Sequence, residues 1–204
     1  MRVNKKKFIY LISPNKIYKK FFKDLQKVLE TGKISFFQLR LKKYSFKNKI
    51  LIGKKIKNIC KKNKVKFLIN DDPILAKRLG ADGCHLGQKD MNIKEARKII
   101  GKKIIGITCH NSITLAKIAI KAKASYLAFG AFYSSKTKKT KYSANIKILK
   151  KIKKITKTPI VAIGGINSEN YKNLLLNNAN FLAISGYIWN NKKYKPLEAL
   201  ERLK

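Results

Sequence analysis

The sequence predicts a single-domain α/β protein with the (β/α)8 TIM-barrel fold, in which eight parallel strands alternate with helices. Eight short apolar runs lie along the 204 residues, and a lysine-rich stretch with helical spacing follows each of them. The short connections predict a parallel sheet that is covered by helices. Eight such units favour a closed barrel over an open sheet, and no GxGxxG motif follows the first run to suggest dinucleotide binding.

The limits of the expected elements follow from the apolar runs and from the residues at the helix ends. Asn111-Ser112 and Asn167-Ser168 have the sequence of helix N-caps, whereas Gly80 and Gly101 suit helix C-termini. No linker divides the chain, so one domain should span residues 1–204. We expect strands at residues 8–12, 34–39, 66–69, 83–86, 103–107, 126–129, 159–163 and 181–184. We expect helices at residues 18–30, 46–62, 73–79, 93–99, 112–122, 145–155, 168–177 and 197–203.

The net charge of +39 comes from 49 lysine and arginine residues against 10 acidic ones. The lysines are spread over every expected helix instead of forming one patch, and no aromatic platform is interleaved with them. We therefore expect no dedicated nucleic-acid partner, although the charge should steer anionic small-molecule substrates toward the protein.

Neither a membrane segment nor an extracellular location is expected. No apolar run approaches the roughly 20 residues that span a bilayer. The basic start of the chain is followed only by the apolar run 8–12, which is too short for a signal-peptide core. Cys60, Cys84 and Cys109 are far apart and form no CxxC pair, so no disulfide framework or zinc site is expected. These observations predict a cytoplasmic protein.

Alternating polar side chains follow the second expected strand. Gln38, Arg40 and Lys42 alternate with Leu39 and Leu41, and this period of two places them on one side of an extended segment. In a barrel, that side can face the lumen near its mouth. Arginine and lysine at such a place suit a phosphate or diphosphate group.

Three acidic residues follow the third and fourth expected strands of a chain that has few of them. Asp71 and Asp90 would converge on a hard cation, and Mg²⁺ commonly binds one or two carboxylates together with substrate phosphates. Asp72 stands directly before Pro73, and a helix N-cap is the simpler interpretation there.

The ends of the last three strands suit phosphate groups. Gly164-Gly165 follows the seventh expected strand and Ser185-Gly186 follows the eighth, where TIM barrels usually bind phosphate. The longest irregular stretch, residues 131–143, follows the sixth strand, and long loops in compact domains are usually functional. Its hydroxyl and lysine side chains suit a second phosphate and belong to Ser135, Thr137 and Lys138.

The chain has only two histidines, and no nucleophile–base pair stands out. His85 lies in the fourth expected strand, where a hydrogen-bonded barrel histidine is the simpler interpretation. His110 lies at a strand end and could move a proton. The site is therefore expected to hold anions and a metal ion and not to form a covalent intermediate.

Together these residues resemble the thiamine phosphate synthase family, over nearly the whole chain from Tyr10 to Ser185. Each matching segment is modest alone, but seven of them occur in order and in one barrel register. The segments are QLRLK (38–42), INDD (69–72), GADG (80–83), HLGQKD (85–90), IGITCH (105–110), SKTK (135–138) and IGGI (163–166).

The resemblance implies a transferase of thiamine biosynthesis. Such enzymes join hydroxymethylpyrimidine diphosphate to a thiazole phosphate, plain or carboxylated, and release diphosphate by a dissociative substitution. The resemblance implies Mg²⁺ as the cofactor, held by Asp71 and Asp90. It implies that the pyrimidine diphosphate is bound by Gln38, Arg40, Lys42, Asn70, Thr108 and Lys138, of which Arg40, Thr108 and Lys138 are catalytic. It implies that the thiazole phosphate is bound by Ser135, Thr137, Gly165, Ile184 and Ser185.

Some positions depart from the family pattern, and two other functions stay open. Leu41 replaces a common acidic residue, and Tyr187 stands where isoleucine is usual and could alter the thiazole phosphate pocket. A thiazole tautomerase on the same fold would use His110 and would need neither diphosphate nor metal. A non-catalytic phosphate- or RNA-binding protein is the less favoured alternative. The oligomeric state stays open, and a homo-oligomer is possible.

Overall fold

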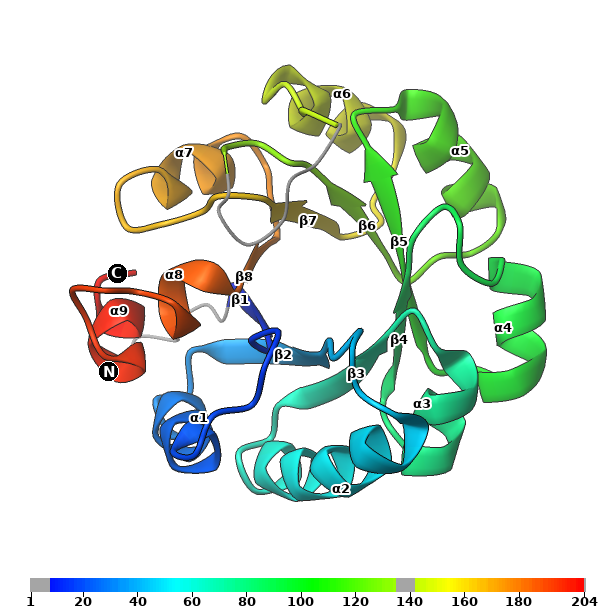
Figure 1. The fold of residues 1–204 in the computed structure, drawn as a ribbon. Helices are drawn as coiled ribbons and strands as arrows, with labels where there is room; N and C mark the ends of the chain where they lie inside the picture. Colours follow the sequence, from blue (N-terminus) through cyan, green and yellow to red (C-terminus); the bar gives the residue numbers. More distant parts are fainter. Residues whose placement is uncertain (1–7, 135–141, 204) are drawn as a thin grey trace, which may run out of the picture.

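The computed structural model describes residues 8–134 and 142–203. Eight strands close into a barrel in chain order, and each strand runs parallel to both neighbours. Figure 1 looks along the barrel and shows the strands as an inner ring with the helices outside it. The strands are β1 (Ile9–Ile12), β2 (Ile34–Leu39), β3 (Lys66–Asn70), β4 (Gly83–Leu86), β5 (Ile104–His110), β6 (Tyr126–Phe129), β7 (Ile160–Ile163) and β8 (Phe181–Ile184). The helices are α1 (Phe21–Glu30), α2 (Phe46–Lys62), α3 (Pro73–Leu79), α4 (Ile93–Ile100), α5 (Ile113–Lys121), α6 (Lys147–Ile155), α7 (Tyr171–Leu176), α8 (Gly186–Trp189) and α9 (Pro196–Glu201).

The predicted TIM barrel is confirmed, and α2 and α3 coincide with their expected ranges. The short helix α8 was not expected. The strand β5 runs on to His110, so Thr108 and His110 lie within a strand and not after it. Four residues are too few for a helical apolar period, which is why α8 could not be predicted from the sequence.

The predicted N-cap at Asn167-Ser168 is wrong. The Asn167 side chain accepts hydrogen bonds from the main-chain N–H groups of Glu169 and Asn170, at 2.9 and 3.1 Å. These bonds close a turn, and α7 begins only at Tyr171. An asparagine that bonds the main chain two residues on has the sequence signature of a cap but makes a turn here.

Other helix ends follow the expected chemistry. The Asp72 carboxylate accepts a hydrogen bond of 2.8 Å from the Leu75 N–H, and Pro73 occupies the first turn of α3, so Asp72 is an N-cap. Ser112 caps α5 in the same way, and Gly80 ends α3 in the left-handed conformation.

The alternation of side chains along the strands separates two hydrophobic cores. One lies between the strands and the surrounding helices and contains most of the buried aliphatic side chains. The other fills the interior of the barrel with Tyr10, Ile12, Leu68, Tyr126, Ala128, Val161 and Ala183, with Phe36, Ile104, Ile163 and Phe181 packed against them. The barrel interior is therefore filled with side chains, and ligands can reach only its ends.

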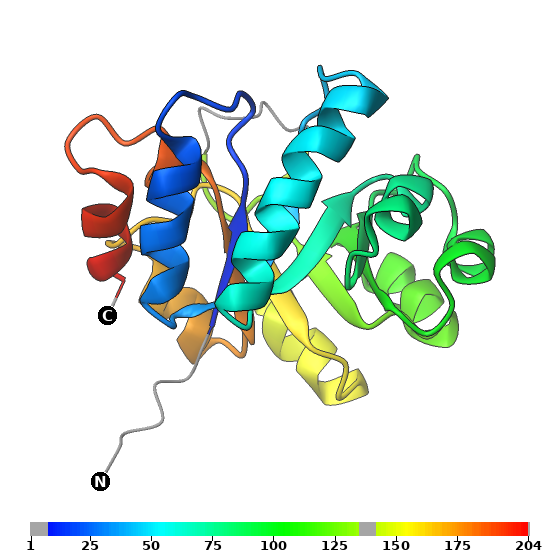
Figure 2. The same ribbon diagram turned by 90° about the horizontal axis from the view of Figure 1, so that it is seen from below.

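The side view of Figure 2 shows the helices standing beside the barrel. The first helix, α1, contacts the last, α9, and this contact closes the outer ring. In residues 8–134 and 142–203, no helix combines the length and the apolar character that crossing a membrane requires. A cytoplasmic location stays a prediction.

Candidate active site

Polar side chains gather where the strands of the barrel end. Arg40 follows β2, and its main-chain N–H donates to the Ser13 hydroxyl at 2.9 Å. Its guanidinium Nη1 donates to the Asn15 side chain at 2.9 Å. Ser13 and Asn15 follow β1, so the ends of the first two strands hold Arg40 in place. These roles of Ser13 and Asn15 could not be predicted from the sequence, because the contacts join segments that are distant in the chain.

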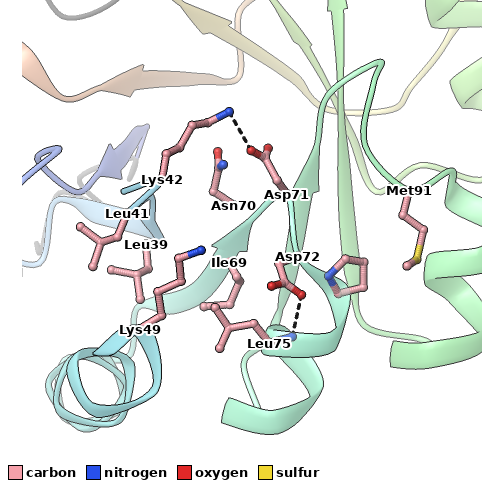
Figure 3. A pocket seen from close by; sticks show the side chains of 11 residues that line it. Leu39, Leu41, Lys42, Lys49, Ile69, Asn70, Asp71, Asp72, Leu75 and Met91 are labelled. Carbon is pink, nitrogen blue, oxygen red and sulfur yellow. Dashed lines mark hydrogen bonds and ion pairs between the residues drawn. The ribbon is translucent and has the colours of Figure 1, made fainter. Parts of the chain in front are cut away.

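An ion pair links the ends of β2 and β3. The Lys42 Nζ lies 3.0 Å from the Asp71 carboxylate (Figure 3). Asp71 has a positive φ of 64°, a conformation that side-chain-bearing residues adopt rarely and mostly at turns or functional sites. Both residues line a pocket of about 490 Å³ together with Asn70 and Lys49. The remaining wall is largely apolar and includes Leu39, Leu41, Leu75 and Met91.

A second carboxylate, that of Asp90, lies beside Asp71. Asp90 accepts a hydrogen bond of 2.6 Å from the Gly87 N–H. Burial raises the pKa of Asp90, although the Gly87 N–H acts in the opposite direction, and the neighbouring Asp71 raises it further. Burial also opposes ionisation of Asp71, but hydrogen bonds from Lys42 and Asp90 outweigh it and lower the pKa of Asp71. Each negative charge disfavours the other at such a short distance, and a cation bound between the two carboxyl groups would favour the ionised form of both.

The two carboxyl groups fit a magnesium ion that is shared with a substrate. Within residues 8–134 and 142–203, no group of three or more histidine, cysteine or acidic side chains gathers to form a complete metal cage. Mg²⁺ does not need one, because it retains water molecules and binds substrate phosphates beside one or two carboxylates. Lys42 lies 3.0 Å from Asp71, and Arg40 precedes Lys42 by two residues at the end of β2, so both are further positive charges for those phosphates.

The side chains of Gln38 and Thr108 form hydrogen bonds with residues whose side chains lie inside the barrel. Gln38 is 3% exposed, and its Nε2 donates to the Tyr10 hydroxyl at 2.6 Å. The Thr108 hydroxyl lies 2.8 Å from the His85 Nε2. The expectation that His85 is a hydrogen-bonded barrel histidine is confirmed, because its Nδ1 also lies 2.9 Å from the Tyr126 hydroxyl.

His110 and Cys109, at the end of β5, differ in their surroundings. The His110 ring stacks on Tyr142 with centroids 3.8 Å apart, and its φ of 52° is positive. Cys109 is buried, and burial raises the pKa of its thiol to about 12, so the reactive thiolate is absent at neutral pH.

The ends of β7 and β8 present main-chain groups and one hydroxyl. Gly165 has a φ of 61°, and a Cβ atom there would lie 2.2 Å from the Ser134 carbonyl oxygen, so only glycine fits. The Ser185 hydroxyl donates to the Ser13 carbonyl at 3.0 Å. The Ile184 side chain packs in the core between the strands and the helices, so only its main chain can face a ligand. The predicted residues Ser135, Thr137 and Lys138 lie outside the described residues.

The chain is similar to known proteins over its whole length. Residues 9–188 match the family model described as thiamine monophosphate synthase. A thiamine-phosphate synthase of Pelagibacter ubique is 70% identical and covers 100% of both chains. One of Erythrobacter litoralis is 39% identical over 94% of this chain and 92% of its own. The solved structure of a thiamine phosphate pyrophosphorylase from Pyrococcus furiosus is 28% identical, with a TM-score of 0.86 over 98% of this chain and 94% of that one. The chain therefore belongs to the thiamine monophosphate synthase family.

Proposed function

We propose that this protein is a thiamine-phosphate synthase that joins hydroxymethylpyrimidine diphosphate to a thiazole phosphate and releases diphosphate. The observation that carries the proposal is the set of opposite charges at the mouth of the barrel. Asp71 and Asp90 lie together, and Lys42 and Arg40 stand at the end of the neighbouring strand. A metal-bound diphosphate requires both signs of charge in one place.

The diphosphate end of the first substrate would be held by Arg40, Lys42 and Asn70, with Lys138, which follows β6 in the sequence. The bond between the pyrimidine methylene carbon and the diphosphate oxygen breaks, and its electron pair leaves with the diphosphate. The fixed cations of Arg40 and Lys42 stabilise this developing negative charge. When bound by Asp71 and Asp90, Mg²⁺ supplies further neutralisation of the diphosphate charge.

The second substrate would bind across the barrel mouth, at the ends of β7 and β8. The main chain at Gly165 and Ile184 would hold its phosphate together with Ser135 and Thr137, and the Ser185 hydroxyl would turn from the Ser13 carbonyl to join them. Binding there orients the thiazole nitrogen, whose lone pair forms the new carbon–nitrogen bond once the diphosphate has left.

The tautomerase alternative has less support in the site. That reaction needs only a proton-transfer residue such as His110, and it gives no reason for Arg40, Asp71 and Asp90 to stand at the same mouth. A non-catalytic nucleic-acid-binding role would likewise leave the two carboxylates unexplained, because they would repel the phosphate backbone.

The first test is product formation from hydroxymethylpyrimidine diphosphate and thiazole phosphate, with Mg²⁺ and with a chelator. We expect thiamine phosphate and an equal amount of diphosphate with Mg²⁺, and neither with the chelator. Absence of product from folded protein in the presence of Mg²⁺ would favour the tautomerase, and His110 would then be the residue to test.

Arg40→Ala should mainly weaken the use of the diphosphate substrate. A charge-assisted hydrogen bond contributes about 1.5–3 kcal/mol, so kcat/KM for the pyrimidine diphosphate should fall roughly 10- to 100-fold. The KM for the thiazole phosphate should change little. Arg78→Ala is the matched control, because Arg78 is exposed in the last turn of α3. An equal loss of thiazole phosphate binding in Arg40→Ala would contradict the placement of Arg40.

A further inference from the structure

Five polar side chains form a continuous chain of hydrogen bonds across the interior of the barrel. Gln38 on β2 bonds Tyr10 on β1 at 2.6 Å, and Tyr10 bonds Tyr126 on β6 at 2.7 Å. Tyr126 bonds the His85 Nδ1 on β4 at 2.9 Å, and the His85 Nε2 bonds Thr108 on β5 at 2.8 Å. The chain begins at a buried amide and ends at a partly exposed hydroxyl nearer the mouth.

The chemistry of these groups determines which one donates and which one accepts in each of the four hydrogen bonds. The Gln38 Nε2 can only donate, so the Tyr10 oxygen accepts. The distance between the two phenol oxygens allows either to donate, but the Tyr10 hydroxyl has one proton, and the Tyr126 oxygen at 2.7 Å is the acceptor that its surroundings offer among the described residues.

The same reasoning gives the donor and the acceptor of the two remaining hydrogen bonds, from Tyr126 to His85 and from His85 to Thr108. The Tyr126 proton then points to the His85 Nδ1, which must accept it. A neutral imidazole that accepts at Nδ1 holds its own proton at Nε2 and donates it to Thr108. The Thr108 oxygen therefore accepts from His85, and its own hydroxyl proton points elsewhere.

The two phenols are suited to fixed roles in such a chain. Burial raises the pKa of both Tyr10 and Tyr126 above the usual phenol value, so each keeps its single proton at any working pH. Tyr10 and Tyr126 are 1% and 3% exposed, and water cannot readily replace either partner. In this low-dielectric interior an unpaired polar group is costly, which favours the one arrangement that pairs all five.

We infer that Tyr10, Tyr126 and His85 are positioning residues that hold the Thr108 hydroxyl as a hydrogen-bond donor toward an anionic oxygen at the barrel mouth. The identity of that oxygen, a diphosphate oxygen of the pyrimidine substrate, rests on the proposed function. The direction of the chain does not, because it follows from the groups inside the barrel alone. Arg40 and Lys42 would bind a diphosphate oxygen through their positive charges. Thr108 would bind one through its hydroxyl proton, and the hydrogen bonds that begin at Gln38 set the direction in which that proton points.

The direct test is the tautomer of His85 in the protein without substrates, read from the ¹⁵N shifts and couplings of the imidazole. The protein contains only two histidines, so a His110→Gln spectrum identifies the signals of His85. At a pH where the imidazole is neutral, we expect a protonated Nε2 and an unprotonated, hydrogen-bonded Nδ1. A proton on Nδ1 would overturn the inference.

Two variants interrupt the series of hydrogen bonds at different places. Tyr126→Phe removes the donor to Nδ1, and Gln38→Met removes the donor that sets the direction; each should convert the single tautomer into a mixture. Tyr18→Phe is the matched control, because it removes a hydroxyl that bonds Asp24 outside the barrel, and it should leave the His85 signals unchanged. If Tyr126→Phe does not fold, Gln38→Met still decides. An unchanged tautomer in the folded variants would overturn the inference.

Activity then tests the link to Thr108. Tyr126→Phe and Thr108→Val should each lower kcat/KM for the pyrimidine diphosphate roughly tenfold, and the double variant should lose no more than either alone. Multiplied losses would mean that Tyr126 acts independently of Thr108, and would refute its positioning role. The tautomer result holds even if the protein makes no thiamine phosphate, so failure of the proposed function and failure of this inference are distinguishable.

Discussion

Asp71→Asn and Asp90→Asn should each lower the rate of thiamine phosphate formation by roughly 100- to 1,000-fold while the fold stays intact. Each change removes a charged ligand of the proposed Mg²⁺, and loss of one such electrostatic contact to a transition state costs about 3–4 kcal/mol. The fold should survive because both side chains lie at the mouth and outside both hydrophobic cores. Removing one of two neighbouring carboxylates also relieves repulsion. Initial rates at several Mg²⁺ concentrations, with a thermal unfolding curve for each variant, measure both effects.

Asp72→Asn is the matched control for this pair. Asp72 is next to Asp71 in the chain and has the same chemistry, but its carboxylate caps α3. Asparagine caps helices about as well as aspartate, so this variant should keep both its stability and most of its activity. Unchanged turnover of Asp71→Asn or Asp90→Asn at saturating Mg²⁺ would remove the metal assignment.

The distinction between Asp71 and Asp72 could be predicted from the sequence because it depends on local chemistry. Pro73 fixes the start of α3, and the residue before it is then a cap. The barrel itself was predictable for a similar reason, since eight alternations of strand and helix leave few ways to bury every apolar face. The prediction failed at Asn167, because the same sequence pattern occurs at helix N-caps and in turns. In both structures the side-chain oxygen accepts a hydrogen bond from a main-chain N–H that follows it.

The network inside the barrel could not be predicted. Gln38 and Arg40 alternate along one segment and share one side of it, yet the amide bonds Tyr10 inside the barrel while the guanidinium bonds Asn15 at the mouth. The side-chain period gives the side of a strand but not the depth along the barrel axis. That depth depends on how far each strand is shifted against its neighbours, which is a property of the closed sheet and not of any one segment.

Gly106→Ala should be strongly destabilising, because Gly106 provides the space for Tyr126. Gly106 lies in the middle of β5 and is paired with His85 on one side and Tyr126 on the other. A Cβ atom there would lie 1.8 Å from the Tyr126 Cζ and 2.3 Å from its hydroxyl oxygen. A ring packed in the barrel interior has no room to move, so we expect a loss of about 3 kcal/mol in the free energy of unfolding, at the upper end of the usual range for overpacking.

Denaturant unfolding of three variants separates this clash from a general effect of replacing glycine. Gly32→Ala is the control, because a Cβ atom there meets nothing within 4 Å and only its φ of 69° is unfavourable. That conformation should cost about 1–2 kcal/mol.

The decisive variant is Gly106→Ala combined with Tyr126→Leu, which removes the ring that the new methyl group would strike. If the ring is the cause, adding Gly106→Ala to Tyr126→Leu should cost far less than adding it to the parent protein. Equal costs in both backgrounds would mean that Gly106 is needed for its backbone alone, and that the position of Tyr126 in the barrel does not depend on it.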